Sequence, residues 1–199
     1  MRLILASSSP YRRQLLERLG LPFSVERPDL DETPLPHETP EALALRLSEA
    51  KALKIARHHP GALVIGSDQA ADFEGHPIGK PGNFERARAQ LQQFSGKQVV
   101  FHSALCVTDG MRTDTRSVPT ECLFRTLNNA QIEHYLRREQ PFDTAGSAKA
   151  EGLGIALMES MRSDDPTAII GLPLIALARM LRSFGVNPLT HGWPLGPDL

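Results

Sequence analysis

The chain has 199 residues, of which 41% are hydrophobic and 23% charged, and its formal net charge is −1. This length and composition allow one sizeable domain with a packed core, which we expect over residues 1–199. The near-neutral charge argues against binding to nucleic-acid backbones, so any anion that binds must meet a local cluster of cations.

Strands and helices alternate through the first half of the chain. Short apolar runs bounded by turn residues predict strands, and apolar residues at helical spacing between capping residues predict helices. In chain order we expect a strand over 3–6, a helix that ends at Gly20, a strand over 23–26, a helix over 40–58, a strand over 62–65 and a helix over 83–94. The acidic, proline-rich stretch from 27 to 40 is expected to be a long loop, a feature that is often functional.

The second half of the chain begins with a hairpin signal. Asp109-Gly110 lies between two long strand-like segments, which predicts a tight turn between paired strands. Beyond it we expect a helix over 130–138, a glycine-rich loop over 143–154, a pair of strands over 154–160 and 166–173, a helix over 174–184 and a frayed tail over 187–199. The alternation of strands and helices, with one hairpin, indicates a mixed α/β architecture.

The cysteines and the apolar runs bear on the compartment. Cys106 and Cys122 form neither a CxxC pair nor a Cys/His set with metal-ligand spacing, and both lie in strand-like segments. We expect buried free thiols, as in a reducing cytosol. No apolar run approaches the length of a membrane span, and Leu3–Ala6 is too short for a signal peptide. We therefore expect a soluble cytoplasmic protein that does not bind a membrane.

The stretch Ser7-Ser8-Ser9-Pro10-Tyr11-Arg12-Arg13 lies between the first strand and the first helix. Serine followed by proline is in itself a good helix start. Two arginines in the first turn, however, oppose the helix dipole. A bound anion would resolve this conflict, because backbone N–H groups, serine hydroxyls and guanidinium groups would all face it. The stretch therefore predicts a phosphate site.

Other charged residues lie at predicted junctions. Gly66-Ser67-Asp68-Gln69 is expected to form a turn at a strand end, where a carboxylate can cap the turn, hold Mg²⁺ or activate a water. The remaining candidates are the lysines at 51, 80 and 149 and the acids at 32 and 151, each of which alone can be a solvated surface residue. As a set they can bind a polyphosphate with a divalent metal, although the chain has no Walker A or GxGxxG pattern.

At these residues the chain resembles the Maf (septum-formation inhibitor-like) family of nucleotide pyrophosphatases. The similarity covers nearly the whole chain, through "LILASSSPYRRQLL", "DETP", "EAKA", "IGSDQ", "GKP", "FSG", "FRTL", "AGSAKAEGLG" and "IIGLPL". The chain is most similar to the YceF-like branch, which resembles a 7-methyl-GTP pyrophosphatase. Its aromatic Tyr11, in the SxxR motif, and its Gln69 and Glu151 indicate this branch. In the branch that acts on dTTP and UTP these positions are typically arginine, threonine and glutamine. Relatives in the YceF-like branch carry tryptophan in place of Tyr11.

The resemblance implies a Maf/Ham-like α/β fold, with a central mixed β-sheet flanked by helices and an active-site cleft between two lobes. It also implies a homodimer and hydrolysis of a nucleoside triphosphate to the monophosphate and pyrophosphate with Mg²⁺, Mn²⁺ or Co²⁺. The implied roles are phosphate binding by Ser9, Arg12, Arg13, Lys51, Lys80 and Lys149, base selection by Tyr11, Gln69 and Glu151, metal binding by Glu32 and Asp68, and proton acceptance by Asp68.

Two other functions fit the same residues. One is a pyrophosphatase for other canonical or modified nucleotides, and the other is a non-catalytic nucleotide-binding regulator of septum formation. Asp68 favours an enzyme, because a protein that only binds nucleotide has no need of that carboxylate.

Overall fold

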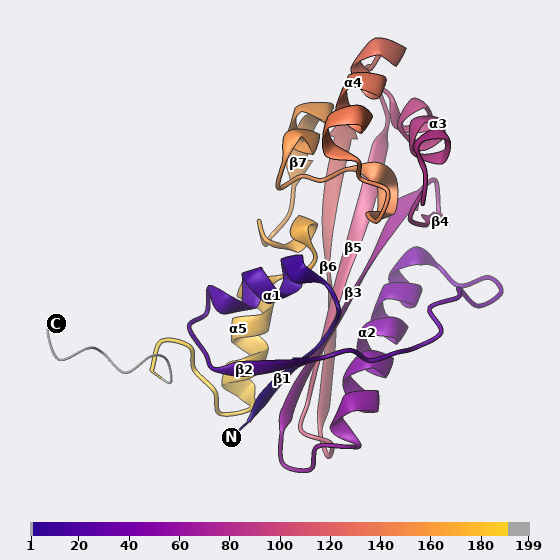
Figure 1. Cartoon of the computed structure of the whole chain (residues 1–199). Coiled ribbons are helices and arrows are strands. Elements are labelled where there is room, and N and C mark those ends of the chain that lie inside the picture. The colour runs from indigo at the N-terminus through magenta and orange to yellow at the C-terminus, as the bar shows by residue number, and fades with distance from the viewer. Residues whose placement is uncertain (1, 191–199) are drawn as a thin grey trace, which may run out of the picture.

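The computed structural model describes residues 2–190 and has a mixed α/β fold (Figure 1). Within these residues a seven-stranded sheet runs through the molecule with five α-helices packed against it. The elements are β1 (Leu3–Ala6), α1 (Pro10–Glu17), β2 (Phe23–Glu26), α2 (Pro40–Ala56), β3 (Leu63–Phe73), β4 (His76–Ile78), α3 (Phe84–Phe94), β5 (Gln98–Thr108), β6 (Thr113–Phe124), α4 (Asn129–Glu139), β7 (Met158–Arg162) and α5 (Leu174–Ser183), with short 3₁₀ turns η1 (Ala145–Ser147), η2 (Leu153–Leu157) and η3 (Ala168–Ile170). None of the described helices has the length and apolar character that crossing a membrane requires.

The sheet is mixed, with strand order β2-β1-β3-β5-β6-β7 and β4 paired to β3. β1 runs parallel to both β2 and β3, and its last residue, Ala6, lies opposite Gly66 of β3. β3 then continues beyond the end of β1, antiparallel to β5 from Val64 to Asp72. Because β3 and β5 are this long, they extend through both ends of the molecule in Figure 1.

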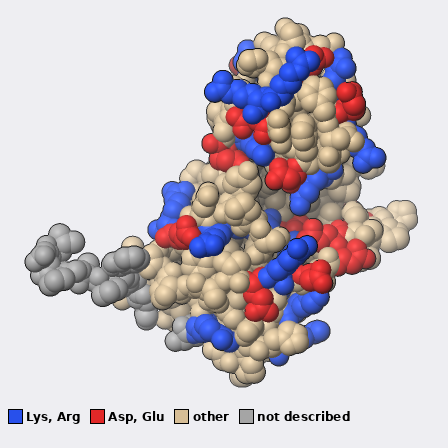
Figure 2. Space-filling model, in the orientation of Figure 1, with Lys and Arg blue, Asp and Glu red and all other residues tan. Residues whose placement is uncertain are grey.

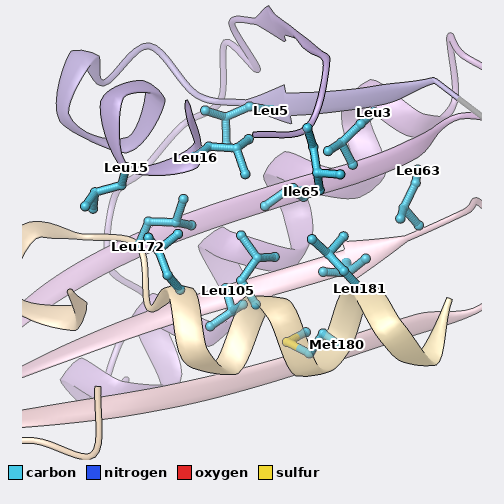
Figure 3. Packing of buried hydrophobic residues seen from close by; sticks show 14 residues of the cluster. Leu3, Leu5, Leu15, Leu16, Leu63, Ile65, Leu105, Leu172, Met180 and Leu181 are labelled. Carbon is cyan, nitrogen blue, oxygen red and sulfur yellow. The ribbon is translucent and has the colours of Figure 1, made fainter. Parts of the chain in front are cut away.

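Two lobes form around these long strands. In the lower lobe of Figure 1, α1 and α5 pack on β1, β3 and β5 around Leu5, Leu16, Ile65, Leu105 and Leu181 (Figure 3). α2 covers the opposite face of the sheet with two separate apolar clusters. In the upper lobe, α3 and α4 pack on the far halves of β3, β5 and β6 around a second core, in which Phe94 contacts Phe73 and Phe124 with tilted rings. The space-filling view is hollowed between the two lobes (Figure 2).

The predicted helix starts are confirmed, because each capping side chain accepts a backbone hydrogen bond from the first turn. Ser9, Thr39 and Asn83 cap α1, α2 and α3 in this way. Asn128 caps α4 and forms a capping box with Gln131. Most predicted strands and the hairpin between β5 and β6 are also present, and the tail predicted to fray lies mainly outside the described residues.

Two predictions about local structure are wrong. Gly66-Ser67-Asp68 is not a turn but the middle of β3, because β5 pairs with this segment through the backbone regardless of its polar side chains. The segment 166–173 is not a strand but a turn around η3, because Asp165 binds the backbone and side chain of Thr167. In addition, β7 begins only at Met158, after η2, and β4 was not predicted.

Gly66 allows α2 to lie unusually close to β3. A Cβ atom built at Gly66 would be 2.1 Å from the carbonyl oxygen of Ser48 and 2.8 Å from the backbone nitrogen of Ala52. Both atoms belong to the α2 backbone, which cannot move aside as a flexible side chain can. The missing side chain is therefore what lets this helix reach the sheet.

We predict that Gly66→Ala lowers the free energy of unfolding by roughly 2 kcal/mol, because the added methyl group must push α2 off the strand. Urea denaturation measures this change. Gly79→Ala is the matched control, since a Cβ there meets no atom within 4 Å, and it should change the free energy of unfolding by less than about 0.5 kcal/mol. Equal stability of the two variants would contradict the close-approach argument.

Candidate active site

A cavity of about 520 Å³ lies between the lobes. Its lower wall comes from the junction of β1 with α1, from the inner face of α2 and from the acidic loop that precedes α2. Its upper wall comes from the segment after β4, which includes Lys80, and from the segment that includes Asp143 and Ala145. Eight of the predicted site residues line it: Ser9, Tyr11, Arg12, Glu32, Lys51, Asp68, Gln69 and Lys80.

A buried ion cluster lies on the lower wall. The ammonium group of Lys51 donates to Asp68 Oδ1 at 2.6 Å and is also 2.6 Å from Glu32 Oε1. Lys51 and Asp68 are only 4% and 8% exposed, whereas the Glu32 side chain is half-exposed. Charges buried to this degree are costly unless they are paired, so each carboxylate stabilises the ammonium between them.

The fold explains why Asp68 faces open space. Asp68 lies two residues beyond Gly66, the last position of β3 that pairs with β1. β1 leaves the sheet after Ala6 to enter α1, and β4 pairs with β3 only from Ala71 onward, so among the described residues no strand pairs with β3 on that side between these points, where the cavity begins. Asp68 therefore lies at the predicted site although the predicted turn is wrong, because the cavity begins where β1 ends and β3 continues past it.

The charges around Glu32 shift its acidity. Partial burial raises the pKa of the Glu32 carboxyl group, but the hydrogen bond from Lys51 and the positive charges of Lys51, Lys80 and Arg12 outweigh that effect. The pKa of Glu32 is therefore below its ordinary value, and the group stays ionised near neutral pH. Lys80, Arg12 and Glu32 all line the same cavity, which accounts for the influence of both cations.

The acidic loop is fixed to α2 by its own ion pair. Arg46 donates to both carboxylate oxygens of Glu38, at 2.5 and 2.8 Å, and to the carbonyl oxygen of Thr33 at 3.2 Å. The hydrogen bond from Arg46 lowers the pKa of Glu38 to about 2. This anchor holds the loop over the cavity and so presents Glu32 to Lys51.

The two neighbouring arginines have different environments. Arg12 is half-buried at the cavity, and its Nε donates to the carbonyl oxygen of Gly171 at 3.0 Å. Burial lowers the pKa of the Arg12 guanidinium, opposed by the negative charges of Asp68 and Glu32. Arg13 is exposed, pairs with Glu17 at 3.0 Å and is not among the residues that line the cavity. Arg12 therefore lies at the candidate phosphate site, as predicted, whereas Arg13 lies outside it.

The turn around η3, which precedes α5, holds several side chains of the site through hydrogen bonds. Asp165 is buried and binds Thr167 through one oxygen and the first backbone N–H groups of α5 through the other. The turn presents carbonyl oxygens that accept hydrogen bonds from the site. Its acceptors are Gly171, bonded by Arg12 and Ser67, Ala168, bonded by Ser103 and Gln69, and Ile169, bonded by Gln69.

Sequence reasoning missed these supporting residues. The dipeptide Asp165-Pro166 is a turn signal that could have replaced the incorrect strand. Ser67 and Ser103 carry no comparable signal, because their role depends on the pairing of β3 with β5 and on the turn beyond them.

Of the three residues predicted to select the base, Tyr11 and Gln69 line the cavity and Glu151 does not. Tyr11 lines the cavity and lies against Lys149, whose ammonium is 3.4 Å from Asp143. Burial lowers the pKa of Lys149, but Asp143 and the Tyr11 hydroxyl outweigh it and raise the pKa overall. Gln69 lines the cavity, with its amide nitrogen bonded to Ser103 and to the turn carbonyls.

Glu151 and Lys149 do not line the cavity. Both belong to the glycine-rich loop at its upper edge, where Lys149 faces Tyr11. Burial and the acids Glu139 and Asp143 raise the pKa of the Glu151 carboxyl group.

The described residues contain no group of three or more His, Cys, Asp or Glu side chains arranged to hold a metal ion. At the cavity wall, however, the carboxylates of Glu32 and Asp68 lie close together, because both pair with the ammonium group of Lys51. Mg²⁺ sites that act on nucleotides use one or two carboxylates and complete the coordination with substrate phosphates and water. The donor set present therefore fits a metal that arrives with a nucleotide.

Comparison with known proteins identifies the class. The family described as "Maf-like protein" matches residues 2–184. Among curated proteins the chain is 67% identical over 189 residues to the 7-methyl-GTP pyrophosphatase of Bordetella pertussis, covering 95% of each chain. It is 69% identical over 188 residues to the protein of that name from Bordetella avium, covering 94% of this chain and 95% of the relative. It is 62% identical over 188 residues to that of Burkholderia orbicola, covering 92% and 89%.

A solved structure, that of the Staphylococcus aureus Ham1 protein, is similar with a TM-score of 0.45 at 18% identity, covering 63% of this chain and 73% of that one. The family match over nearly the whole chain and the high identity of the relatives are decisive. The chain belongs to the Maf family.

The two arginines provide a matched test of the phosphate site. We predict that Arg12→Ala weakens pyrophosphate binding at least tenfold, because it removes a half-buried cation at the cavity wall. Arg13→Ala should change the dissociation constant less than twofold, since Arg13 pairs with Glu17 on the exposed side of α1. Isothermal titration calorimetry with pyrophosphate and Mg²⁺ measures both. A larger loss for Arg13→Ala than for Arg12→Ala would contradict the assignment.

Proposed function

We propose that this protein hydrolyses 7-methyl-GTP to 7-methyl-GMP and pyrophosphate. The observation that carries the proposal is the buried Lys51, paired with Asp68 and Glu32 on the wall of a cavity that also contains Arg12 and Lys80. The curated relatives, at 60–69% identity, are named 7-methyl-GTP pyrophosphatases. A cavity lined by three cations and by several hydroxyl groups around a buried carboxylate suits a triphosphate and an attacking water.

In this proposal, cations hold the triphosphate. Arg12 and Lys80 face the cavity from opposite walls, and Ser9 lies at the N-terminus of α1, where backbone N–H groups favour an anion. Attack at the α-phosphorus expels pyrophosphate, which carries much negative charge. Arg12, Lys51 and Lys80 stabilise that charge as it develops, which is the larger part of catalysis in phosphoryl transfer.

Asp68 acts on the attacking water in this proposal. Its buried carboxylate lies where water from the cavity can reach it, and Lys51 holds it in one orientation. The carboxylate accepts a proton from the water as the bond to phosphorus forms. Glu32 and Asp68 are the residues that would hold a divalent metal, which when bound offsets phosphate charge and acidifies a bound water.

Base choice rests on Tyr11. Methylation at N7 leaves a positive charge spread over the guanine ring, and such a ring is attracted to an aromatic face more strongly than neutral guanine is. Tyr11 lies at the cavity beside the phosphate-binding Arg12. The roles of Glu151, which can accept the guanine N1–H and exocyclic N–H₂, and of Gln69 remain predictions.

We also propose that the protein works in the cytoplasm. The support is the state of Cys106 and Cys122, which are both free and buried. Burial raises the pKa of the Cys106 thiol to about 11 and that of Cys122 to about 12, so neither is a reactive thiolate. Unpaired thiols are ordinary in a reducing compartment.

We predict that Asp68→Asn folds normally and lowers kcat at least about a hundredfold, because the amide cannot accept the proton of the water. The matched control is Asp72→Asn on the same strand, whose carboxylate pairs with His102 and does not line the cavity. The measurements are pyrophosphate release from 7-methyl-GTP and the melting temperature of each variant. A well-folded Asp68→Asn enzyme with near-normal turnover would remove Asp68 from the mechanism.

Substrate preference tests the proposed function directly. We predict that kcat/KM is highest for 7-methyl-GTP, lower for GTP and lowest for UTP and dTTP. Tyr11→Ala should narrow the lead of 7-methyl-GTP over GTP, because it removes the aromatic face. Glu151→Gln should narrow the lead over the pyrimidines. A wild-type preference for dTTP or UTP would contradict the substrate and leave a pyrophosphatase of other specificity.

A further inference from the structure

The upper wall of the cavity consists of two loops that belong to different parts of the chain. One follows β4 and carries Gly79 and Lys80, and the other follows α4 and carries Asp143, Ala145 and, slightly further on, Lys149. The sheet holds the first of these loops only as far as Ile78, the last residue of β4 that pairs with β3. The position of Lys80 over the phosphate site therefore depends on what ties the loops in place beyond that residue.

Gln90 connects the two loops through one side chain. Its amide nitrogen donates to the carbonyl oxygen of Gly79 at 3.0 Å, and its amide oxygen accepts from the hydroxyl group of Ser147 at 2.5 Å. Gln90 is half-buried on α3, which lies beside β4 in the upper lobe (Figure 1). Gly79 immediately precedes Lys80, and Ser147 lies two residues before Lys149.

Both loops that Gln90 joins need support from outside their own residues. Lys80 is exposed and no ion pair within residues 2–190 includes it, so its own side chain gives the loop no anchor. Lys80 nevertheless lines the same cavity as Glu32 and Arg12, which lie on its opposite wall. Ser147 is buried with a backbone φ of +55°, a strained conformation for serine that its contacts must hold.

We propose that Gln90 is a positioning residue for the hydrolysis of nucleoside triphosphates: it links the loops at Gly79 and Ser147 and so holds Lys80 over the phosphate site. The inference rests on the proposed function, since it concerns the same triphosphate. Gln90 does not touch the substrate. Its two hydrogen bonds fix the backbone from which Lys80 extends, and misplacement of a binding group by about 1 Å can cost up to about a hundredfold in rate.

One backbone hydrogen bond supports the same contact. The N–H of Gly82 donates to the carbonyl oxygen of Phe142 at 2.9 Å, and this bond joins the two loops at another point. Gln90 supplies the second tie, on the side of Lys80. Loss of the side chain should therefore loosen the loops locally without unfolding either lobe.

The first test measures the loops themselves. Gln90→Leu keeps the size of the side chain and removes both hydrogen bonds. Gln92→Leu on the same helix is the matched control, because the exposed amide of Gln92 donates to Asn129 and bonds neither loop within residues 2–190. Hydrogen–deuterium exchange in peptides over 77–83 and 142–149 should accelerate at least threefold in Gln90→Leu and stay unchanged in Gln92→Leu. Equal exchange in both variants would overturn the proposal.

The second test asks whether Gln90 acts through Lys80. In a double-mutant cycle, Gln90→Leu should weaken pyrophosphate binding about tenfold in the wild-type background and less than twofold in Lys80→Ala, and kcat/KM for the triphosphate should follow the same pattern. Gln90→Glu, which keeps an acceptor for Ser147 but has no donor for Gly79, should behave like Gln90→Leu.

A tenfold effect of Gln90→Leu that persists in Lys80→Ala would overturn the proposal, because Gln90 would then act by another route. Wild-type protein that turns over no nucleoside triphosphate would instead overturn the proposed function. The exchange comparison would still show whether Gln90 fixes the loops, so the two failures are distinguishable.

Discussion

The contact between Lys51 and the carboxylates of Asp68 and Glu32 is the interaction on which the site depends. Lys51 comes from α2, Asp68 from β3 and Glu32 from the acidic loop, so one ammonium group joins three elements at the cavity wall. The contact exists because Gly66 lets α2 approach β3 at backbone distance. Its charges are buried but paired, and they lie beside the space that a phosphate would fill.

The length of β3 and β5 gives this cluster its cavity. Both strands continue past the end of β1, so the lower lobe stops while the sheet goes on into the upper lobe. The step between the lobes places Asp68 on the wall of the cavity and Lys80 opposite Arg12. Supporting polar contacts come from outside the cavity: the carbonyl groups of the turn at 168–171 hold Arg12 and Gln69, and Arg46 fixes the acidic loop.

Much of the fold could be predicted from the sequence, because local signals determine it. Proline after Ser9 and Thr39, and Asn128 before Gln131, mark helix starts that the structure confirms. The extension of β3 through Asp68 could not be predicted, since its polar residues are held by pairing with the distant β5. For the same reason, sequence spacing could not separate Arg12, which reaches the cavity, from Arg13, which points away and pairs with Glu17.

The central claim is that water attacks the α-phosphorus of 7-methyl-GTP and that pyrophosphate leaves. Hydrolysis in water enriched in ¹⁸O, followed by mass spectrometry of the products, tests it most directly. We predict one ¹⁸O atom in 7-methyl-GMP and none in the pyrophosphate released with it. Label in pyrophosphate, release of orthophosphate in its place, or no turnover of the nucleotide would contradict the account.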